Sequence, residues 1–227
     1  MKQKIRVFFL IIFSALFIFS SYKVYMYLKE YTKVKKEISN INEVINKNDN
    51  FMDSLKAMNN DVVSYIKIEG TNIDYPVVQT DNNDFYLKHT FDKSYSEYGW
   101  IFMDYRNEGF NSQNTIIYGH AMKNKTMFGS IKDMFKTSWL DNYKHEIKIY
   151  DGNEFVTYKI FSIYETEAVN DYLHTNFTNE EYKEFINKIL KKSYYDFKTA
   201  VNEDSKMITL STCSRQNKRL VVHGVRV

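Results

Sequence analysis

The 227-residue chain contains one cysteine, Cys213, and one proline, Pro76. A single copy of the chain therefore cannot form an internal disulfide. Only seven glycines occur, and no Gly-rich phosphate-binding loop is present, so a nucleotide-binding loop of that kind is not indicated. Arginine is also scarce, and its positions are Arg6, Arg106, Arg215, Arg219 and Arg226. This scarcity makes each of these side chains worth examining.

Charge and short motifs exclude several classes of protein. The net charge is +3, with lysines and acidic residues interspersed, so a bulk electrostatic attraction to nucleic acid is not indicated. Neither a His-Glu-x-x-His zinc motif nor a Gly-x-Ser-x-Gly serine-hydrolase elbow occurs. The length and the aromatic content of 17% suit a targeting or membrane segment followed by one folded domain.

The N-terminus combines basic residues with a long apolar run. Three basic residues within the first six positions precede apolar residues 7–19, and the run reaches Leu28 if Lys23 extends its ammonium group to the interface. The residues around Ser20 and Ser21 are too large for signal-peptide cleavage, which favours an uncleaved anchor. We therefore predict a single-pass cell-membrane protein with a short cytoplasmic tail and an extracellular C-terminal domain.

The remaining pattern predicts three regions: a tail and anchor over 1–28, a helical stalk over 29–60, and a domain over 61–227. The domain contains short runs with β-type alternation or β-branched residues. They cover 62–68, 73–79, 99–105, 114–120, 146–152, 154–166, 207–213 and 219–227. About eight strands with few helices predict a mainly β fold, a closed or nearly closed barrel decorated by helices.

Local signals define three connections within this domain. Asp151-Gly152 between two strands predicts a hairpin with a type I′ turn. Thr178 followed by Glu181 is a capping box, and it starts a helix over 178–192 with one apolar face. Residues 126–135 predict a shorter helix or turn.

The candidate chemistry centres on Cys213. An unpaired cysteine in an exported domain is either an intermolecular partner or a reactive thiol, although a lone strand cysteine is often a small buried hydrophobe. His120 ends the strand "NTIIYGH" directly after Gly119, whose missing side chain leaves room there. Arg219 opens the strand after the Cys213 loop, and Arg215 within that loop is a second choice. The residues alone leave an active site and a buried structural cysteine at even odds.

Other polar residues have plainer interpretations. His145 and His174 lie in charged surroundings and are predicted to be solvated, and His89 lies in a polar stretch. His223, inside the last strand, is predicted to be structural. A further pair, Asp104 and Arg106, predicts a structural ion pair or turn.

Several segments together resemble the sortase family, from about Val62 to the C-terminus. They are "NTIIYGH" with "MFGSIKDM" after it, "ITLSTC" followed by "KRLVVHGVRV", and "GTNIDYPVVQTDNNDFYL". The last segment and the predicted helix before "MITLSTC" are similar to class B, most of all to clostridial members. The resemblance implies an eight-stranded sortase barrel with an N-terminal helical extension and a helix between the sixth and seventh strands.

The resemblance also implies a cysteine transpeptidase with no cofactor or metal. Its expected partners are exported proteins with a Thr-containing C-terminal sorting signal, a peptidoglycan precursor amine and the membrane, without nucleic acid. Cys213 is then the nucleophile, His120 the general acid and base, and Arg219 the oxyanion partner. Ser211, Asn83 and Leu87 are expected to line the substrate groove. A thiol peptidase that hydrolyses exported or wall peptides, and an inactive tethered binding domain, are the alternatives.

Overall fold

The computed structural model describes residues 2–47, 50–168, 171–213 and 218–227; Lys2 and Cys213 are described by their main chain. Predictions about the loop after Cys213, including Arg215, therefore lie outside the described residues. The chain divides into two compact units, Met1–Asp49 and Asn50–Val227.

The first unit is a single helix, α1 (Lys2–Lys47). The predicted anchor and the first part of the predicted stalk are continuous within it. Apolar side chains over 5–28 are exposed around the helix, with Phe13 64% and Phe17 73% accessible. Within the described residues, α1 is the helix that is long and apolar enough to cross a membrane. Its length and composition are consistent with the predicted anchor.

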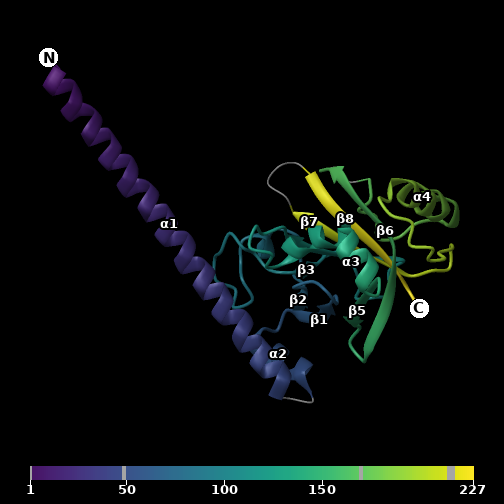
Figure 1. Ribbon diagram of the computed structural model, residues 1–227. Coiled ribbons are helices and arrows are strands. Elements are labelled where there is room, and N and C mark those ends of the chain that lie inside the picture. The colour runs from purple at the N-terminus through teal and green to yellow at the C-terminus, as the bar shows by residue number, and fades with distance from the viewer. Residues whose placement is uncertain (1, 48–49, 169–170, 214–217) are drawn as a thin grey trace. The chain divides into compact units, whose positions relative to one another are not determined.

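The second unit is a closed eight-stranded β-barrel (Figure 1). Its strands follow the order β1-β2-β3-β4-β7-β8-β6-β5, and pairing of β1 with β5 closes the barrel. The β2–β3 and β4–β7 pairs are parallel, and the others are antiparallel. The strands are β1 (Val62–Lys67), β2 (Asp74–Val78), β3 (Phe102–Met103), β4 (Asn114–His120), β5 (Glu146–Tyr150), β6 (Phe155–Glu167), β7 (Met207–Cys213) and β8 (Lys218–Arg226). This architecture confirms the predicted barrel.

Short helices decorate the barrel, and the largest of them, α4, lies beside β6 (Figure 1). The predicted capping box is present, since Thr178 Oγ1 accepts from the Glu181 N–H and the Glu181 carboxylate accepts from the Thr178 N–H. The apolar face of α4 packs with Met207, Val221 and Val225. The helices are α2 (Phe51–Met58), the 3₁₀ turns η1 (Phe85–Leu87) and η2 (Phe128–Phe135), α3 (Thr137–Asn142) and α4 (Asn179–Lys192).

Two predicted elements differ in detail. The β5–β6 hairpin is present, but its loop has four residues rather than a two-residue type I′ turn, because Tyr150 pairs with Phe155. The Asp151 carboxylate accepts from the N–H groups of Asn153 and Glu154, which stabilises this longer loop. The strand predicted over 99–105 shortens to the two residues of β3, because the chain turns immediately after Met103.

His223 is the buried structural histidine that the sequence predicts. Its ring is fully buried between Tyr164, whose hydroxyl lies 3.0 Å from Nε2, and Thr209, whose hydroxyl lies 2.9 Å from Nδ1. Thr209 donates its own proton to Asn114 Oδ1 at 2.7 Å, so Nδ1–H must donate to Thr209 and Nε2 must accept from Tyr164. Burial, aided by the charge of Lys192, lowers the pKa of His223 to about 3.

This histidine predicts an acid-dependent loss of stability. Below about pH 6.5 the unfolded chain binds a proton at His223, whereas the folded chain binds one there only near pH 3. The free energy of unfolding therefore falls as the pH falls through that range. Chemical denaturation is expected to show that the stability advantage of the wild type over His223→Gln shrinks from pH 7 to pH 4. The exposed His174→Gln is the control, and a His223→Gln deficit that is independent of pH would contradict the prediction.

Candidate active site

The parallel ladder between β4 and β7 brings His120 beside Cys213. The pairing runs from Asn114 with Met207 to His120 with Cys213, the last residue of each strand. Neighbouring strands lie about 4.8 Å apart, so the main chains of the two residues are adjacent. Both residues therefore lie at the same end of the barrel wall.

The β7–β8 pair brings Arg219 to the same end. The antiparallel register reaches Ser211 with Val221, and the Leu220 N–H then donates to Thr212 Oγ1 at 2.8 Å. Cys213 and Arg219 each lie two positions beyond this last recorded pair, toward the same end of β7 and β8. Arg219 is half-buried, and its other strand neighbour is Thr166 of β6. One row across β4, β7 and β8 thus contains a histidine, the cysteine and an arginine.

The His120 ring is half-buried, and its Nε2 lies 2.8 Å from the main-chain oxygen of Leu87. The sequence suggests that Gly119 leaves open room at the strand end, but the structure shows no such room. A Cβ there would lie 2.5 Å from Ile101 Cδ1 and 2.9 Å from Phe128, because core side chains already fill that space. Gly119 therefore allows β4 to pack closely on the core.

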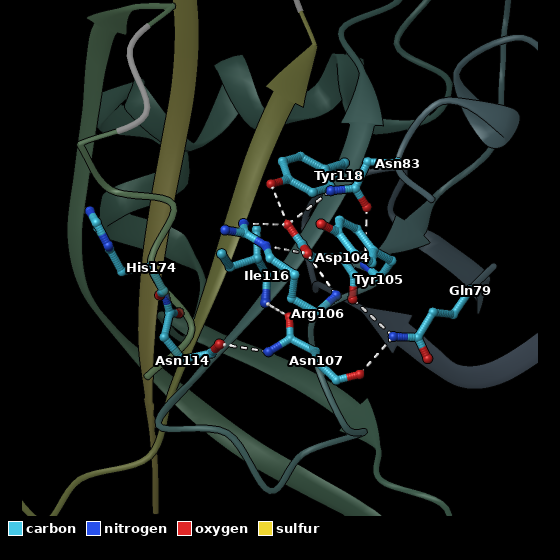
Figure 2. A network of polar contacts seen from close by, with 10 residues as sticks. All are labelled: Gln79, Asn83, Asp104, Tyr105, Arg106, Asn107, Asn114, Ile116, Tyr118 and His174. Carbon is cyan, nitrogen blue, oxygen red and sulfur yellow. Dashed lines mark hydrogen bonds and ion pairs between the residues drawn. The ribbon is translucent and has the colours of Figure 1, made fainter. Parts of the chain in front are cut away.

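A buried carboxylate, Asp104, organises a polar network that includes Tyr118 of β4 (Figure 2). Its Oδ1 accepts from the N–H and Nε of Arg106, each at 2.9 Å. Its Oδ2 accepts from Arg106 at 2.7 Å, from the Tyr118 hydroxyl at 2.8 Å and from Asn83 Nδ2 at 3.0 Å. The predicted ion pair is thus present, and it also links β4 to the segment before η1.

Loss of the Asp104 charge is expected to destabilise the domain. Burial by itself raises the pKa of Asp104, but hydrogen bonds from Arg106 and Tyr118 and the charge of Arg106 outweigh it and hold the pKa below its ordinary value. Asp104→Asn leaves buried donors facing an amide and is expected to lower the unfolding free energy by about 3 kcal/mol at pH 7. Chemical denaturation measures this difference.

The sign of the pH dependence follows from the lowered pKa of Asp104. Its contribution is complete above about pH 3.9, the ordinary value, and is lost as the pH falls through the lower pKa of the folded state. The deficit of Asp104→Asn should therefore persist from pH 7 to pH 5 and shrink below about pH 4. Asp196→Asn, which removes the exposed ion pair with Lys198, is the control and should change stability little, because solvent screens that pair. An equal loss in the two variants would contradict the prediction.

The three predicted groove residues have different surroundings. Asn83 is half-buried, and its amide binds Asp104 and the Tyr105 N–H (Figure 2). Leu87 is half-buried at the end of η1. Ser211 is 1% exposed and exchanges a hydrogen bond of 2.9 Å with the hydroxyl of Tyr172, which precedes α4.

The other histidines lie outside the row. His174 is exposed, as predicted, and His89 stacks on Phe85 with ring centroids 4.0 Å apart. His145 is half-buried rather than solvated. Its Nε2 lies 2.9 Å from the Leu140 oxygen, and its ring packs against Trp139. The His145 ring also packs against Tyr195 and Phe197, which are distant in sequence, so local charge did not reveal its burial.

The composition of the row suits acyl transfer. A thiolate attacks a carbonyl, an imidazole carries protons, and a guanidinium stabilises developing negative charge. Within the described part of the chain, no group of three or more His, Cys, Asp or Glu side chains is arranged to hold a metal.

Comparison with known families agrees with the fold. The family model of the sortase domain matches residues 66–227, and the chain belongs to the sortase family. The chain is therefore a cysteine transpeptidase, as this family is.

The relatives assign the chain to class B within this family. Sortase B of Staphylococcus aureus is 38% identical over 178 residues, which cover 75% of this chain and 72% of that protein. The crystal structure of Clostridium perfringens sortase B is 35% identical, covers 77% of this chain and 98% of its own, and has a TM-score of 0.73. A Staphylococcus aureus sortase B–substrate complex is 31% identical, covers 88% and 96%, and has a TM-score of 0.78.

Proposed function

We propose that this sortase cleaves a Thr-containing sorting signal near the C-terminus of exported proteins and transfers the cleaved protein to a peptidoglycan amine. The observation that carries the proposal is the row of His120, Cys213 and Arg219 across three adjacent strands. The structure of a related sortase B with a bound substrate supports a substrate site on this fold.

The three residues of the row have complementary roles in this reaction. The Cys213 thiolate attacks the carbonyl carbon of the signal threonine and forms a thioester, and the downstream peptide leaves as an amine. His120 protonates that amine and later removes a proton from the incoming amine. Arg219, permanently charged with a rigid fork of donors, stabilises the negative oxygen of each tetrahedral intermediate.

The groove residues contribute in different ways. Asn83 and Leu87 are half-buried, so each retains surface that a peptide can contact. Ser211 is buried and hydrogen-bonded to Tyr172, which is also buried, so it offers almost no surface to a peptide in this structure. Substitution of Asn83 also disturbs Asp104, so its effect on binding must be separated from its effect on stability.

The N-terminal helix defines the place of the reaction in this proposal. The exposed apolar surface of α1 over residues 5–28 anchors the chain in the cell membrane. The catalytic unit then lies outside the cell, where exported proteins and wall precursors meet.

Turnover of a sorting-peptide panel by the full chain in detergent micelles tests this function. Mass spectrometry should detect cleavage after threonine and, with an added amine, an amide of that amine. Products that contain only a free carboxylate would replace the transpeptidase with a thiol peptidase. Absence of any cleavage would leave a binding domain.

A further inference from the structure

The contact between His120 and η1 defines which ring nitrogen carries a proton. His120 Nε2 lies 2.8 Å from the main-chain oxygen of Leu87. A carbonyl oxygen can only accept a hydrogen bond, so Nε2 must carry a hydrogen. Neutral imidazole has one N–H, and Nδ1 is therefore the basic nitrogen of the neutral ring.

Gly99 packs against both partners of this hydrogen bond. Its φ is +57°, and a Cβ there would lie 2.9 Å from His120 Cδ2 and 2.9 Å from the Leu87 oxygen. The same Cβ would lie 2.5 Å from the Tyr86 oxygen. The edge of the His120 ring and the Leu87 carbonyl therefore both lie against Gly99, where a side chain has no space.

The Leu87 carbonyl is itself held by its surroundings. The Trp100 N–H donates to the Tyr86 oxygen at 2.9 Å, and the Ser96 N–H donates to the Lys88 oxygen at 2.8 Å. The main chain is thus tied to the Gly99 segment on both sides of Leu87. Such support restricts the carbonyl to one direction, which precise positioning of a catalytic side chain requires.

We propose that the Leu87 carbonyl and Gly99 form a clamp that holds Nε2–H of His120, so that Nδ1 is the nitrogen that exchanges the catalytic proton. The inference rests on the proposed function. The Cys213 thiol supplies the second ring proton, which Nδ1 holds while Nε2 keeps its own hydrogen. During acylation, the C–S bond forms and the C–N bond breaks, and the Nδ1–H bond breaks as its proton moves to the nitrogen of the departing peptide. During transfer, Nδ1 accepts a proton from the incoming amine as the new C–N bond forms and the C–S bond breaks. Nε2–H stays on Leu87 throughout.

The clamp can be tested in the wild-type protein by determining which ring nitrogen of His120 carries the hydrogen. The full chain, labelled with ¹⁵N-histidine and held in detergent micelles, is examined by NMR at alkaline pH, where an imidazole is neutral. The His120 signals are those that disappear in His120→Gln. The expected coupling pattern is that of the Nε2–H tautomer, and a dominant Nδ1–H tautomer overturns the clamp.

Gly99→Ala tests the clamp through activity, with Gly109→Ala as its matched control. Gly109 has a similar φ of +59°, but a Cβ there meets nothing within 4 Å, so the control shares the backbone strain alone. Gly99→Ala is expected to lower kcat by about 10- to 100-fold and to weaken the tautomer preference. Gly109→Ala should stay within about twofold of the wild type. A folded Gly99→Ala with wild-type kcat overturns the clamp, and if that variant does not fold, the wild-type tautomer decides.

The activity of His120→Gln separates this inference from the function on which it rests. An inactive His120→Gln together with the Nδ1–H tautomer in the wild type removes the clamp and leaves the proposed function intact. A fully active His120→Gln removes the catalytic role of His120, and the clamp with it.

Discussion

Cys213→Ala is expected to abolish cleavage and transfer of sorting peptides, with a fall in kcat of about 10⁴-fold or more. Without the thiol no thioester can form, and both half-reactions are lost together. Turnover of the peptide panel measures the loss. Circular dichroism and thermal unfolding establish that the variant remains folded.

The single thiol gives this experiment an internal control. A thiol-directed electrophile can modify the wild-type chain only at Cys213, so the expected labelling is one equivalent for the wild type and none for the variant. Labelling should inactivate the wild type in proportion to its extent. Normal turnover by Cys213→Ala, or by a fully labelled wild type, would refute the assignment of the nucleophile.

Arg219→Ala is expected to lower kcat/KM by about 10²- to 10³-fold, because the oxyanion loses its charged donors. Arg219→Lys should recover only part of this loss, since an ammonium retains the charge without the planar fork of donors. Steady-state kinetics on one sorting peptide compares the three proteins. Labelling of Cys213 should remain complete in both variants, which distinguishes a lost oxyanion partner from a lost nucleophile.

Arg226→Ala is the matched control for this change, because Arg226 lies at the other end of the same strand. Its guanidinium forms an ion pair of 3.0 Å with Asp151 at the β5–β6 loop, far along β8 from the row. Its removal should cost stability and change kcat/KM by less than about twofold. Equal kinetic losses in Arg219→Ala and Arg226→Ala would show that the effect comes from β8 as a whole.

The barrel and its longest decorating helix could be predicted from local sequence. Alternation of apolar residues defines the strands, and the Thr178–Glu181 spacing defines the start of α4, because both signals act within a few residues. Which strands pair with one another could not be predicted from local sequence. The residues alone left Cys213 at even odds, and its association with His120 came from the family resemblance, because parallel pairing of β4 with β7 leaves no local signal.

The details around the row could not be predicted for a related reason. Leu87 contacts His120 through its carbonyl, which every residue possesses, so the side chain gives no indication. Gly99 is one of seven glycines, and its role depends on atoms of His120 and Tyr86 that are distant in sequence. Asp104 was recognised with its neighbour Arg106, but its bonds to Asn83 and Tyr118 required the fold.

The β4–β7 ladder also has a consequence for how the enzyme matures. Asn114 and Thr209, hydrogen-bonded across this ladder, lie 95 positions apart, so the ladder can close only after most of the domain has been synthesised. His120 and Cys213 come together only at that late step. Because His120 precedes Cys213 in the chain, an unfinished chain carries the proton carrier without its thiol, and acyl-transfer activity starts only when β7 joins β4.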